Sequence, residues 1–294
     1  MRDVETVLSS GCAGLNLQPI VILCPTQIGT FQAPVARGVA VMSVYSVEND
    51  GVFSKDKGSR AAQTDWQAYA AAYDLLSAHN PEYQSLLSGF EDFLSQLDGP
   101  SVIYDIGGGT GNYSQIIARC CPTSQIRFIE PDPGMLGVAQ RKLSDHDNII
   151  FENAGLESAG APGDADLIVS IHSLYAMPDQ QDRLADMRRM LRPGGLLYLV
   201  DLGRAMNVSD WRRYLFGHLR REHGLFGACR IFWQGREIAK QNANIRASQD
   251  DGTYWTHSGD ELATAVRNAG FEVLRQEVVY RGYSDLLICR ATDL

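Results

Sequence analysis

The segment 101–111 carries the residues of this chain that are best suited to chemistry. It reads S-V-I-Y-D-I-G-G-G-T-G, so that an apolar run leads into Asp105 and then into glycines at 107, 109 and 111. Glycine at such a turn lets the backbone bend tightly and lets a ligand lie against the main chain. An acidic residue just before the turn suits a cationic group such as the ammonium of an amino acid. The pattern therefore predicts a site for an amino-acid nucleoside where a strand meets a helix.

The same turn argues against a nicotinamide dinucleotide. The dinucleotide fingerprint is G-x-G-x-x-G, and when it starts at Gly107 its third glycine falls on Asn112. A pyrophosphate would also need the free N-terminus of the following helix, whereas Asp105 suits a cation. The spacing that fits is D-x-G-x-G-x-G, which makes a dehydrogenase the weaker interpretation.

Further motifs follow in an order that resembles the class I S-adenosylmethionine-dependent methyltransferases. Each is a predicted strand followed by a polar or tight-turning segment. In chain order they are the strand 125–129 before Glu130, P-D-P-G-M-L at 131–136, the strand 149–151 before E-N-A, the strand 164–172 before S-L-Y-A-M-P-D, and R-P-G-G at 192–195 before a strand ending at Asp201. The resemblance covers roughly residues 60–204 and 257–292.

The resemblance implies S-adenosylmethionine as the cofactor and assigns roles to several residues. In the family, an acidic residue at the position of Glu130 holds both ribose hydroxyls, and two carboxylate oxygens can accept from two vicinal donors. The family usually has Gly-Asp-Ala where this chain has Glu-Asn-Ala, and Asn153 can still accept from the adenine amino group. Met135 has core packing as its alternative role. The implied cofactor-binding residues in the core are Asp105, Gly107, Gly109, Gly111, Glu130, Asp132, Met135, Asn153 and Ala154.

An aromatic helix is predicted to begin after Asp65. The run W-Q-A-Y-A-A-A-Y places Trp66, Tyr69 and Tyr73 at spacings of three and four, on one helical face. In related methyltransferases such a helix closes over the cofactor, where a tyrosine hydroxyl can donate to the carboxylate and a ring can attract the sulfonium. We therefore expect Tyr69 and Tyr73 to bind the cofactor, with packing on the sheet as the alternative.

Methyl transfer is a displacement at carbon, so the protein mainly has to align the reactants and exclude water. A base is needed only when the nucleophile must lose a proton. The end of the strand at 164–172 borders the methyl-donor site in related enzymes, which makes His172 and Tyr175 the first candidates for catalytic contact with the acceptor. His257 and Asp201 are second choices.

The long segment 204–257 is expected to form a helical lid, because family members place a substrate lid at this point. The acceptor pocket would be built from this lid, the helix at 66–73 and the end of the strand at 164–172. Those segments are rich in Tyr, Trp and His, which favours a small polar or cationic metabolite over a long acyl chain. The last two strands form a hairpin, and Tyr280, Arg281 and Tyr283 near it either reach the substrate or, as the favoured alternative, pack at the surface.

The expected fold is an α/β doubly wound, mostly parallel seven-stranded sheet with an antiparallel C-terminal hairpin. The first 41 residues show no sustained periodicity and are either an arm over the active site or an upstream extension before Met42. The predicted organisation is an irregular extension at 1–41, a helical cap at 42–98, the cofactor-binding core at 99–203, the lid at 204–257 and the end of the core at 258–294.

The composition of the chain limits the kinds of binding partner that we expect. A net charge of −9 argues against broad nucleic-acid binding, which needs a concentrated basic surface. The six cysteines have no metal-site spacing, so no metal is expected. Without a signal peptide or a long apolar span, we expect no membrane contact, a cytoplasmic location and a small-molecule substrate. The composition leaves open whether the protein is a monomer or a homodimer.

Two alternatives to methyl transfer remain open. The insertion and the segment Y-R-G-Y-S-D faintly resemble azetidine-2-carboxylate synthases, in which the amine of the cofactor attacks its own γ-carbon and methylthioadenosine leaves. The other alternative is a protein that binds the cofactor without catalysis.

Overall fold

A seven-stranded sheet lies at the centre of the described part of the chain, with the order β3-β2-β1-β4-β5-β7-β6. The computed structural model describes residues 64–159 and 163–292, which belong to the unit Lys57–Leu294. The predicted extension at 1–41 and the first part of the predicted cap, 42–63, lie outside the described residues. The strands are β1 (Val102–Ile106), β2 (Gln125–Ile129), β3 (Ile149–Glu152), β4 (Ala165–Ile171), β5 (Leu191–Asp201), β6 (Phe271–Val279) and β7 (Ser284–Ala291).

The sheet confirms the predicted doubly wound topology. Strands β1 to β5 pair in parallel, whereas β7 lies antiparallel between β5 and β6. The strand order reverses between β1 and β4, and ligands of open α/β sheets bind at the carboxyl ends of the strands on either side of such a reversal. The glycine turn after β1 and the S-L-Y-A-M-P-D loop after β4 therefore lie next to each other.

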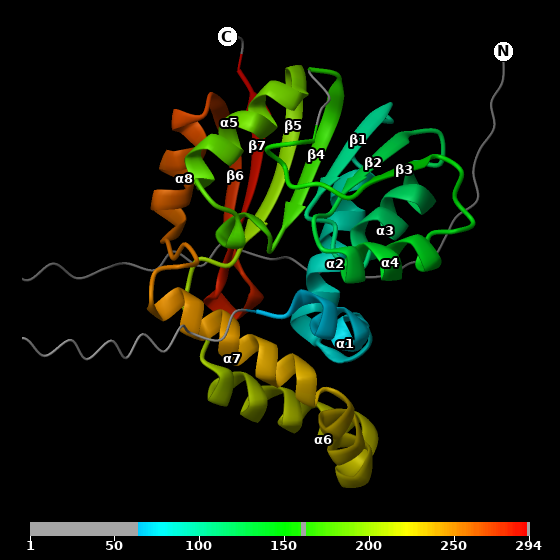
Figure 1. Cartoon of the computed structure of the whole chain (residues 1–294), viewed down its shortest axis with the longest axis vertical. Helices are drawn as coiled ribbons and strands as arrows, with labels where there is room; N and C mark the ends of the chain where they lie inside the picture. Colours follow the sequence, from blue (N-terminus) through cyan, green and yellow to red (C-terminus); the bar gives the residue numbers. More distant parts are fainter. Residues whose placement is uncertain (1–63, 160–162, 293–294) are drawn as a thin grey trace, which may run out of the picture. The chain divides into compact units, whose positions relative to one another are not determined.

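Helices cover both faces of the sheet (Figure 1). Alternate residues of β5 divide between two cores, because successive side chains of a strand point to opposite faces. Tyr198 and Val200 pack with α2, α3 and α4, and Leu197 and Leu199 pack with α5 and α8. The helices are α1 (Trp66–His79), α2 (Pro81–Leu94), α3 (Asn112–Cys120), α4 (Pro133–Lys142), α5 (Gln180–Met190), α6 (Val208–Gln234), α7 (Arg236–Asp250) and α8 (Gly259–Asn268), with short 3-10 turns at Leu174–Ala176 and Tyr280–Gly282.

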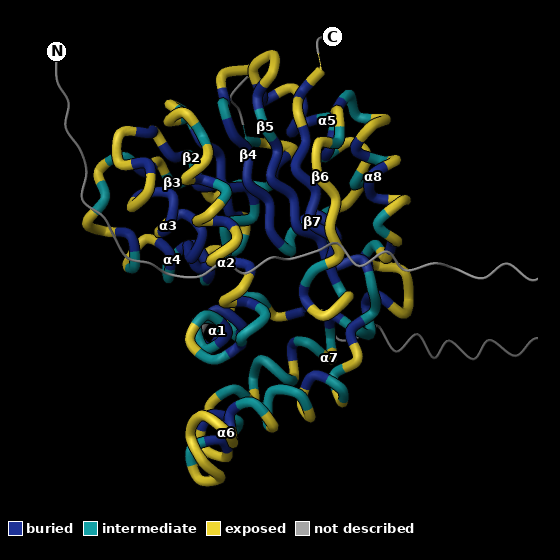
Figure 2. Tube along the Cα trace, turned by 180° about the vertical axis from the view of Figure 1, so that it is seen from behind, coloured by how far each residue is buried: buried dark blue, intermediate teal, exposed yellow. Residues whose placement is uncertain are grey.

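The predicted lid is a pair of helices, α6 and α7, that packs against α1 beyond the end of the sheet (Figures 1 and 2). Helix α6 is interrupted at Gly224, whose φ of 68° and ψ of 179° are not helical. Beyond this break the chain exposes Leu225 and Phe226, and Figure 2 shows the far end of α6 as its most exposed part. On either side of the break, Leu219, Ala228 and Ile231 form a small buried cluster within the lid.

Helix α1 is held at both ends by polar side chains. Asp65 accepts a hydrogen bond of 2.9 Å from the backbone N–H of Ala68. At the other end, Asn80 follows α1 and caps α2 by accepting from Glu82 N at 3.1 Å, and Pro81 occupies the first turn of α2. These caps fix where α1 begins and where the chain turns from α1 into α2.

Candidate cofactor and acceptor site

The three glycines of the turn after β1 share a left-handed backbone conformation but differ in their surroundings. Gly107, Gly109 and Gly111 all have positive φ angles, of 66°, 59° and 82°. A Cβ on Gly109 would meet no atom within 4 Å, so its backbone faces open space. A Cβ on Gly111 would approach Leu143 Cδ1 to 2.8 Å, so this glycine permits α3 and α4 to pack closely. Gly111 thus supports the turn without lining the cavity beside it.

A cavity of about 270 Å³, which we call the cofactor pocket, opens at this turn. It brings together most of the residues that the sequence pattern assigned to the cofactor. Those that line it are Tyr73, Gly107, Gly109, Glu130, Asp132, Met135 and Ala154. The sequence reasoning missed other lining residues, among them Leu156, Ser173 and Met177. Ser173 and Met177 belong to the S-L-Y-A-M-P-D motif, so the position of that loop directly after β4 could have predicted them.

Glu130 lies at the edge of the cofactor pocket with both carboxylate oxygens in use. One oxygen accepts from Gly109 N and the other from Asp132 N, each at 2.9 Å. Burial raises the pKa of this carboxyl to about 7, and the two backbone donors oppose the rise. A carboxylate oxygen has more than one acceptor site, so each can still accept from a ligand hydroxyl.

Asp105 lies deeper, in a small hollow bounded by Tyr73, Gly107 and Gly109. Its carboxylate accepts a hydrogen bond of 2.6 Å from Ser114 Oγ. Burial raises the pKa of Asp105 to about 6, against the effect of the Ser114 hydrogen bond. A cationic group in the hollow would stabilise the ionised carboxylate in return.

Two of the residues assigned to the cofactor, Asp132 and Asn153, form hydrogen bonds with the protein backbone. Asp132 begins α4 by accepting from Met135 N at 2.8 Å, although it also lines the cofactor pocket. Asn153 is exposed and donates from Nδ2 to the carbonyls of Glu130 and Pro131, both at 2.9 Å. Asn153 is not among the lining residues of the pocket, so its side chain holds the loop that carries Glu130.

A second, smaller cavity of about 50 Å³ lies between α1 and the lid, and we call it the inner chamber. Trp66, Tyr73 and His172 line both this chamber and the cofactor pocket, so the two share a wall. The other residues of the chamber are Tyr69, Leu76, Tyr83, Tyr175, Leu202, Met206, Asn242, Ile245 and Tyr280. Tyr280, expected at the surface, is instead buried here, and its hydroxyl accepts from Asn80 Nδ2 at 3.0 Å.

His172 follows β4 directly and has a left-handed φ of 50°. Its Nε2 lies 2.8 Å from Ser284 Oγ, and its ring meets that of Tyr280 at 4.9 Å between centroids. Burial lowers the pKa of the imidazole to about 4. The ring is therefore neutral at neutral pH, and it places no positive charge beside a sulfonium.

Tyr175 also lines the inner chamber, and burial raises the pKa of its hydroxyl well above the ordinary value. Asp201 and His257, the second-choice residues, support the loop of Tyr175 from outside the chamber. Asp201 Oδ1 accepts from Tyr175 N at 3.1 Å, and Asp201 Oδ2 lies 3.1 Å from Nε2 of the buried His257. Neither Asp201 nor His257 lines the cofactor pocket or the chamber. The pair therefore positions the loop after β4.

The residues that line the cofactor pocket and the hollow at Asp105 fit an adenosine with an amino-acid tail. Glu130 offers a carboxylate to vicinal hydroxyls, apolar side chains such as Met135 and Leu156 offer a surface for a base, and Asp105 offers a carboxylate beyond the glycines. Among residues 64–159 and 163–292, no three His, Cys, Asp or Glu side chains are grouped to hold a metal ion. None of the described helices is long and apolar enough to cross a membrane.

Comparisons with known proteins agree with this geometry. A ubiquinone/menaquinone C-methyltransferase UbiE from Hahella chejuensis is 30% identical over 165 residues, which are 54% of this chain and 66% of that protein. A malonyl-[acyl-carrier protein] O-methyltransferase from the same organism is 31% identical over 192 residues, 58% of this chain and 66% of that protein. The chain thus spans just under two thirds of these relatives.

Solved structures share the fold. The N-methyltransferase NodS from Bradyrhizobium japonicum, in complex with S-adenosyl-L-homocysteine, superposes with a TM-score of 0.53 over 78% of this chain and 100% of that chain, at 14% identity. A methyltransferase from Aquifex aeolicus gives a TM-score of 0.51 over 75% of this chain and 98% of that chain, at 13% identity. The family model for a methyltransferase domain matches residues 59–276. The chain belongs to the class I S-adenosylmethionine-dependent methyltransferases, and it is an enzyme of that family with S-adenosylmethionine as its cofactor.

Proposed function

We propose that this enzyme transfers a methyl group to a small molecule whose reacting group lies in the inner chamber. The observation that carries the proposal is the wall that the chamber shares with the cofactor pocket, formed by Trp66, Tyr73 and His172. A reacting group in the chamber would have to reach the donor methyl directly, and the place where it could do so is between these three side chains, where the two cavities adjoin. The same proposal includes a cytoplasmic role in small-molecule metabolism.

The described residues would hold the cofactor in a defined direction. Glu130 would accept from the ribose hydroxyls, Asp105 would receive the ammonium, and Met135 would contact the adenine. The cofactor supplies an electrophilic methyl group on a positively charged sulfur. Tyr73 contributes an aromatic ring where the pocket meets the chamber, and a ring face attracts a cation. Most of the rate then comes from alignment and from exclusion of water.

The chamber favours a polar reacting group. Its tyrosine hydroxyls stay protonated, because burial raises the pKa values of Tyr69 and Tyr175. The Tyr69 hydroxyl already donates to Asn242, so of these two the Tyr175 hydroxyl is the one that can donate to a ligand. His172 is a weak base with a pKa of about 4. The chamber therefore suits a nucleophile that reacts without a strong base, such as a free amine or an already acidic hydroxyl or carbon acid. The names of the relatives include both a C-methyltransferase and an O-methyltransferase, so they do not decide the attacking atom.

Mass spectrometry of nucleoside products tests the proposal. The enzyme is incubated with S-adenosylmethionine alone and then with a metabolite extract. Formation of S-adenosylhomocysteine only with the extract is the expected result. Release of methylthioadenosine from the cofactor alone would instead identify the cyclising reaction, and binding of the cofactor without either product would identify a non-catalytic protein.

A further inference from the structure

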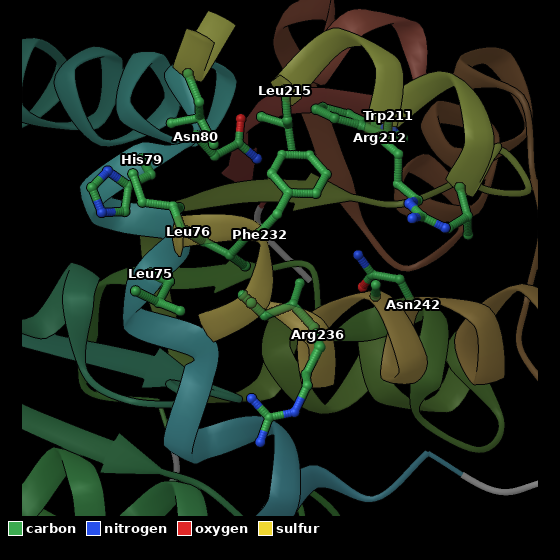
Figure 3. A pocket seen from close by; sticks show the side chains of 16 residues that line it. Leu75, Leu76, His79, Asn80, Trp211, Arg212, Leu215, Phe232, Arg236 and Asn242 are labelled. Carbon is green, nitrogen blue, oxygen red and sulfur yellow. The ribbon is translucent and has the colours of Figure 1, made fainter. Parts of the chain in front are cut away.

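A third cavity, larger than the other two, lies between α1 and the lid, and we call it the lid cavity. Its volume is about 350 Å³, and 16 residues line it (Figure 3). Its walls are mainly apolar, with Leu76 from α1, Leu215 and Phe232 from α6, and Ile238 from α7. Figure 3 shows the ring of Phe232 pointing toward Leu215, while the guanidinium of Arg236 points away from the labelled group. Cavities of this size and character bind small organic molecules.

The lid cavity adjoins the inner chamber. Leu76 and Asn242 line both, so these two side chains form a common wall. Two hydrogen bonds cross from one side of the wall to the other, Tyr69 Oη to Asn242 Oδ1 at 2.9 Å and Asn80 Nδ2 to Tyr280 Oη at 3.0 Å. These two hydrogen bonds hold the wall in place, so a molecule that occupies both the lid cavity and the chamber would have to displace the Asn242 side chain.

Polar groups in the lid cavity are few and are placed at its wall. The indole Nε1 of Trp211 is buried and has no acceptor among the described residues, although the side chain lines the cavity. A buried donor without a partner is costly, and an oxygen atom of a ligand would relieve this cost. Figure 3 shows the guanidinium of Arg212 pointing toward Asn242, where the lid cavity meets the chamber. Both groups suit a molecule that is mostly apolar and carries oxygen.

We propose that the lid cavity binds the apolar body of the methyl acceptor, an amphiphile whose polar reacting end lies in the inner chamber. This inference rests on the proposed methyl transfer and specifies its substrate class. The sequence favoured a small polar or cationic metabolite because the aromatic residues of α1 and the lid were considered together. The structure separates them into a chamber rich in tyrosine and a cavity rich in aliphatic side chains. An acceptor with one polar end and one apolar body matches both.

Direct binding of linear alcohols tests the cavity without requiring turnover. Hexan-1-ol, octan-1-ol and decan-1-ol are titrated into the full-length protein by calorimetry. If the chain enters an apolar cavity, affinity rises roughly fourfold for each added CH₂ group. An affinity that does not increase along the series, or no binding of decan-1-ol up to its solubility limit in water, would overturn the proposal.

Two substitutions on α7 provide a matched pair. Ala239 lines the lid cavity, whereas Ala243, one helical turn later, is exposed and does not line it. Ala239→Phe fills the cavity and is expected to weaken decan-1-ol binding at least tenfold, while Ala243→Phe leaves it unchanged. S-adenosylmethionine binding is expected to stay intact in both variants, which shows that they are folded. Equal alcohol affinity in the two variants would refute the assignment of the cavity.

Turnover then links the cavity to the acceptor. A metabolite extract is divided into organic-soluble and aqueous fractions, and each is assayed for S-adenosylhomocysteine formation. We expect product with the organic-soluble fraction, with Ala239→Phe at least tenfold less active than Ala243→Phe. Product from the aqueous fraction alone would contradict the amphiphile. Absence of product from both fractions, with alcohol binding as predicted, would refute the proposed methyl transfer and leave the lid cavity as a binding site.

Discussion

The hydroxyl of Tyr69 donates a hydrogen bond of 2.9 Å to Oδ1 of Asn242, and this bond joins α1 to α7. It brings together residues 173 positions apart in the chain. Tyr69 lines the inner chamber, and Asn242 lines both the chamber and the lid cavity. The bond therefore ties the lid to the helix that covers the cofactor pocket.

Removing this bond is expected to loosen the lid. Tyr69→Phe and Asn242→Ala should each lower the free energy of unfolding by about 1 kcal/mol, because a buried partner loses its hydrogen bond. Urea unfolding of both variants and of the double variant measures the coupling between the two side chains. We expect a coupling of about 1 kcal/mol, and strictly additive effects would show that the bond contributes no stability.

Glu130 is expected to make cofactor binding dependent on pH. Its pKa is raised to about 7 in the free protein, and donation from the ribose hydroxyls would lower that pKa in the complex. Binding then releases a proton, so affinity falls by up to about tenfold per pH unit as the pH drops below 7. In the free protein the same group has the opposite effect on folding, because stability decreases as the pH rises from 4.5 to about 7.

Calorimetry of S-adenosylmethionine binding between pH 5 and 8, in buffers of different ionisation enthalpy, measures this proton release. Glu130→Gln is the control, because it removes the titrating group but keeps the shape of the side chain. The variant should bind more weakly at pH 8 and lose most of the pH dependence that the ligand itself does not cause. An unchanged profile in Glu130→Gln would remove Glu130 from the site.

Asp105 is expected to contribute its charge to cofactor binding and to contribute little to the stability of the fold. Asp105→Asn removes the charge that would face the ammonium and should weaken cofactor binding at least tenfold, with little loss of stability because the buried carboxyl already has a raised pKa. Ser114→Ala keeps the carboxyl but removes its 2.6 Å hydrogen bond. It should cause a smaller loss of affinity, through a further rise in the pKa of Asp105. Equal losses in the two variants would assign the effect to local structure.

His172 and Tyr175 are expected to affect turnover more than cofactor binding. With an acceptor in hand, His172→Gln and Tyr175→Phe should lower kcat by about tenfold to a hundredfold while the Kd for S-adenosylmethionine changes less than threefold. Ser284→Ala is the matched test of position, because it removes only the partner of His172 Nε2. Steady-state kinetics and calorimetry measure the two quantities. A Kd that worsens as much as kcat falls would place His172 and Tyr175 in cofactor binding.

The pair Asp201 and His257 is expected to matter for stability. Both side chains are fully buried, and Asp201 also holds the backbone of Tyr175. His257→Ala would leave the carboxylate of Asp201 buried without its imidazole, which should cost about 3 kcal/mol of unfolding free energy. Thermal and urea unfolding measure the loss. A variant as stable as the parent would show that the pair is dispensable for the fold.

Local patterns in the sequence determined the elements of the core. Apolar runs followed by turn residues marked β2 at Gln125–Ile129 and located β3 and β4 to within one residue at each end. The start of β5 was wrong, because R-P-G-G at 192–195 was expected to be a turn before the strand, whereas β5 begins at Leu191. The spacing from the glycine turn to Glu130 also predicted residues that the structure brings together in one cavity, because the positions involved are the ends of adjacent strands. Strand formation and tight turns depend on neighbouring residues, so a single sequence contains the information.

The tertiary structure alone decided which residues of these motifs line a cavity. Gly111 permits helix packing and Asn153 supports a loop, although both belong to motifs that resemble cofactor-binding ones. Asp201 and His257, 56 positions apart, form a buried pair that lines neither the cofactor pocket nor the inner chamber. The sequence pattern also did not predict the lid cavity. Its walls come from α1, α6 and α7, and a void between helices depends on how their side chains pack across long stretches of chain.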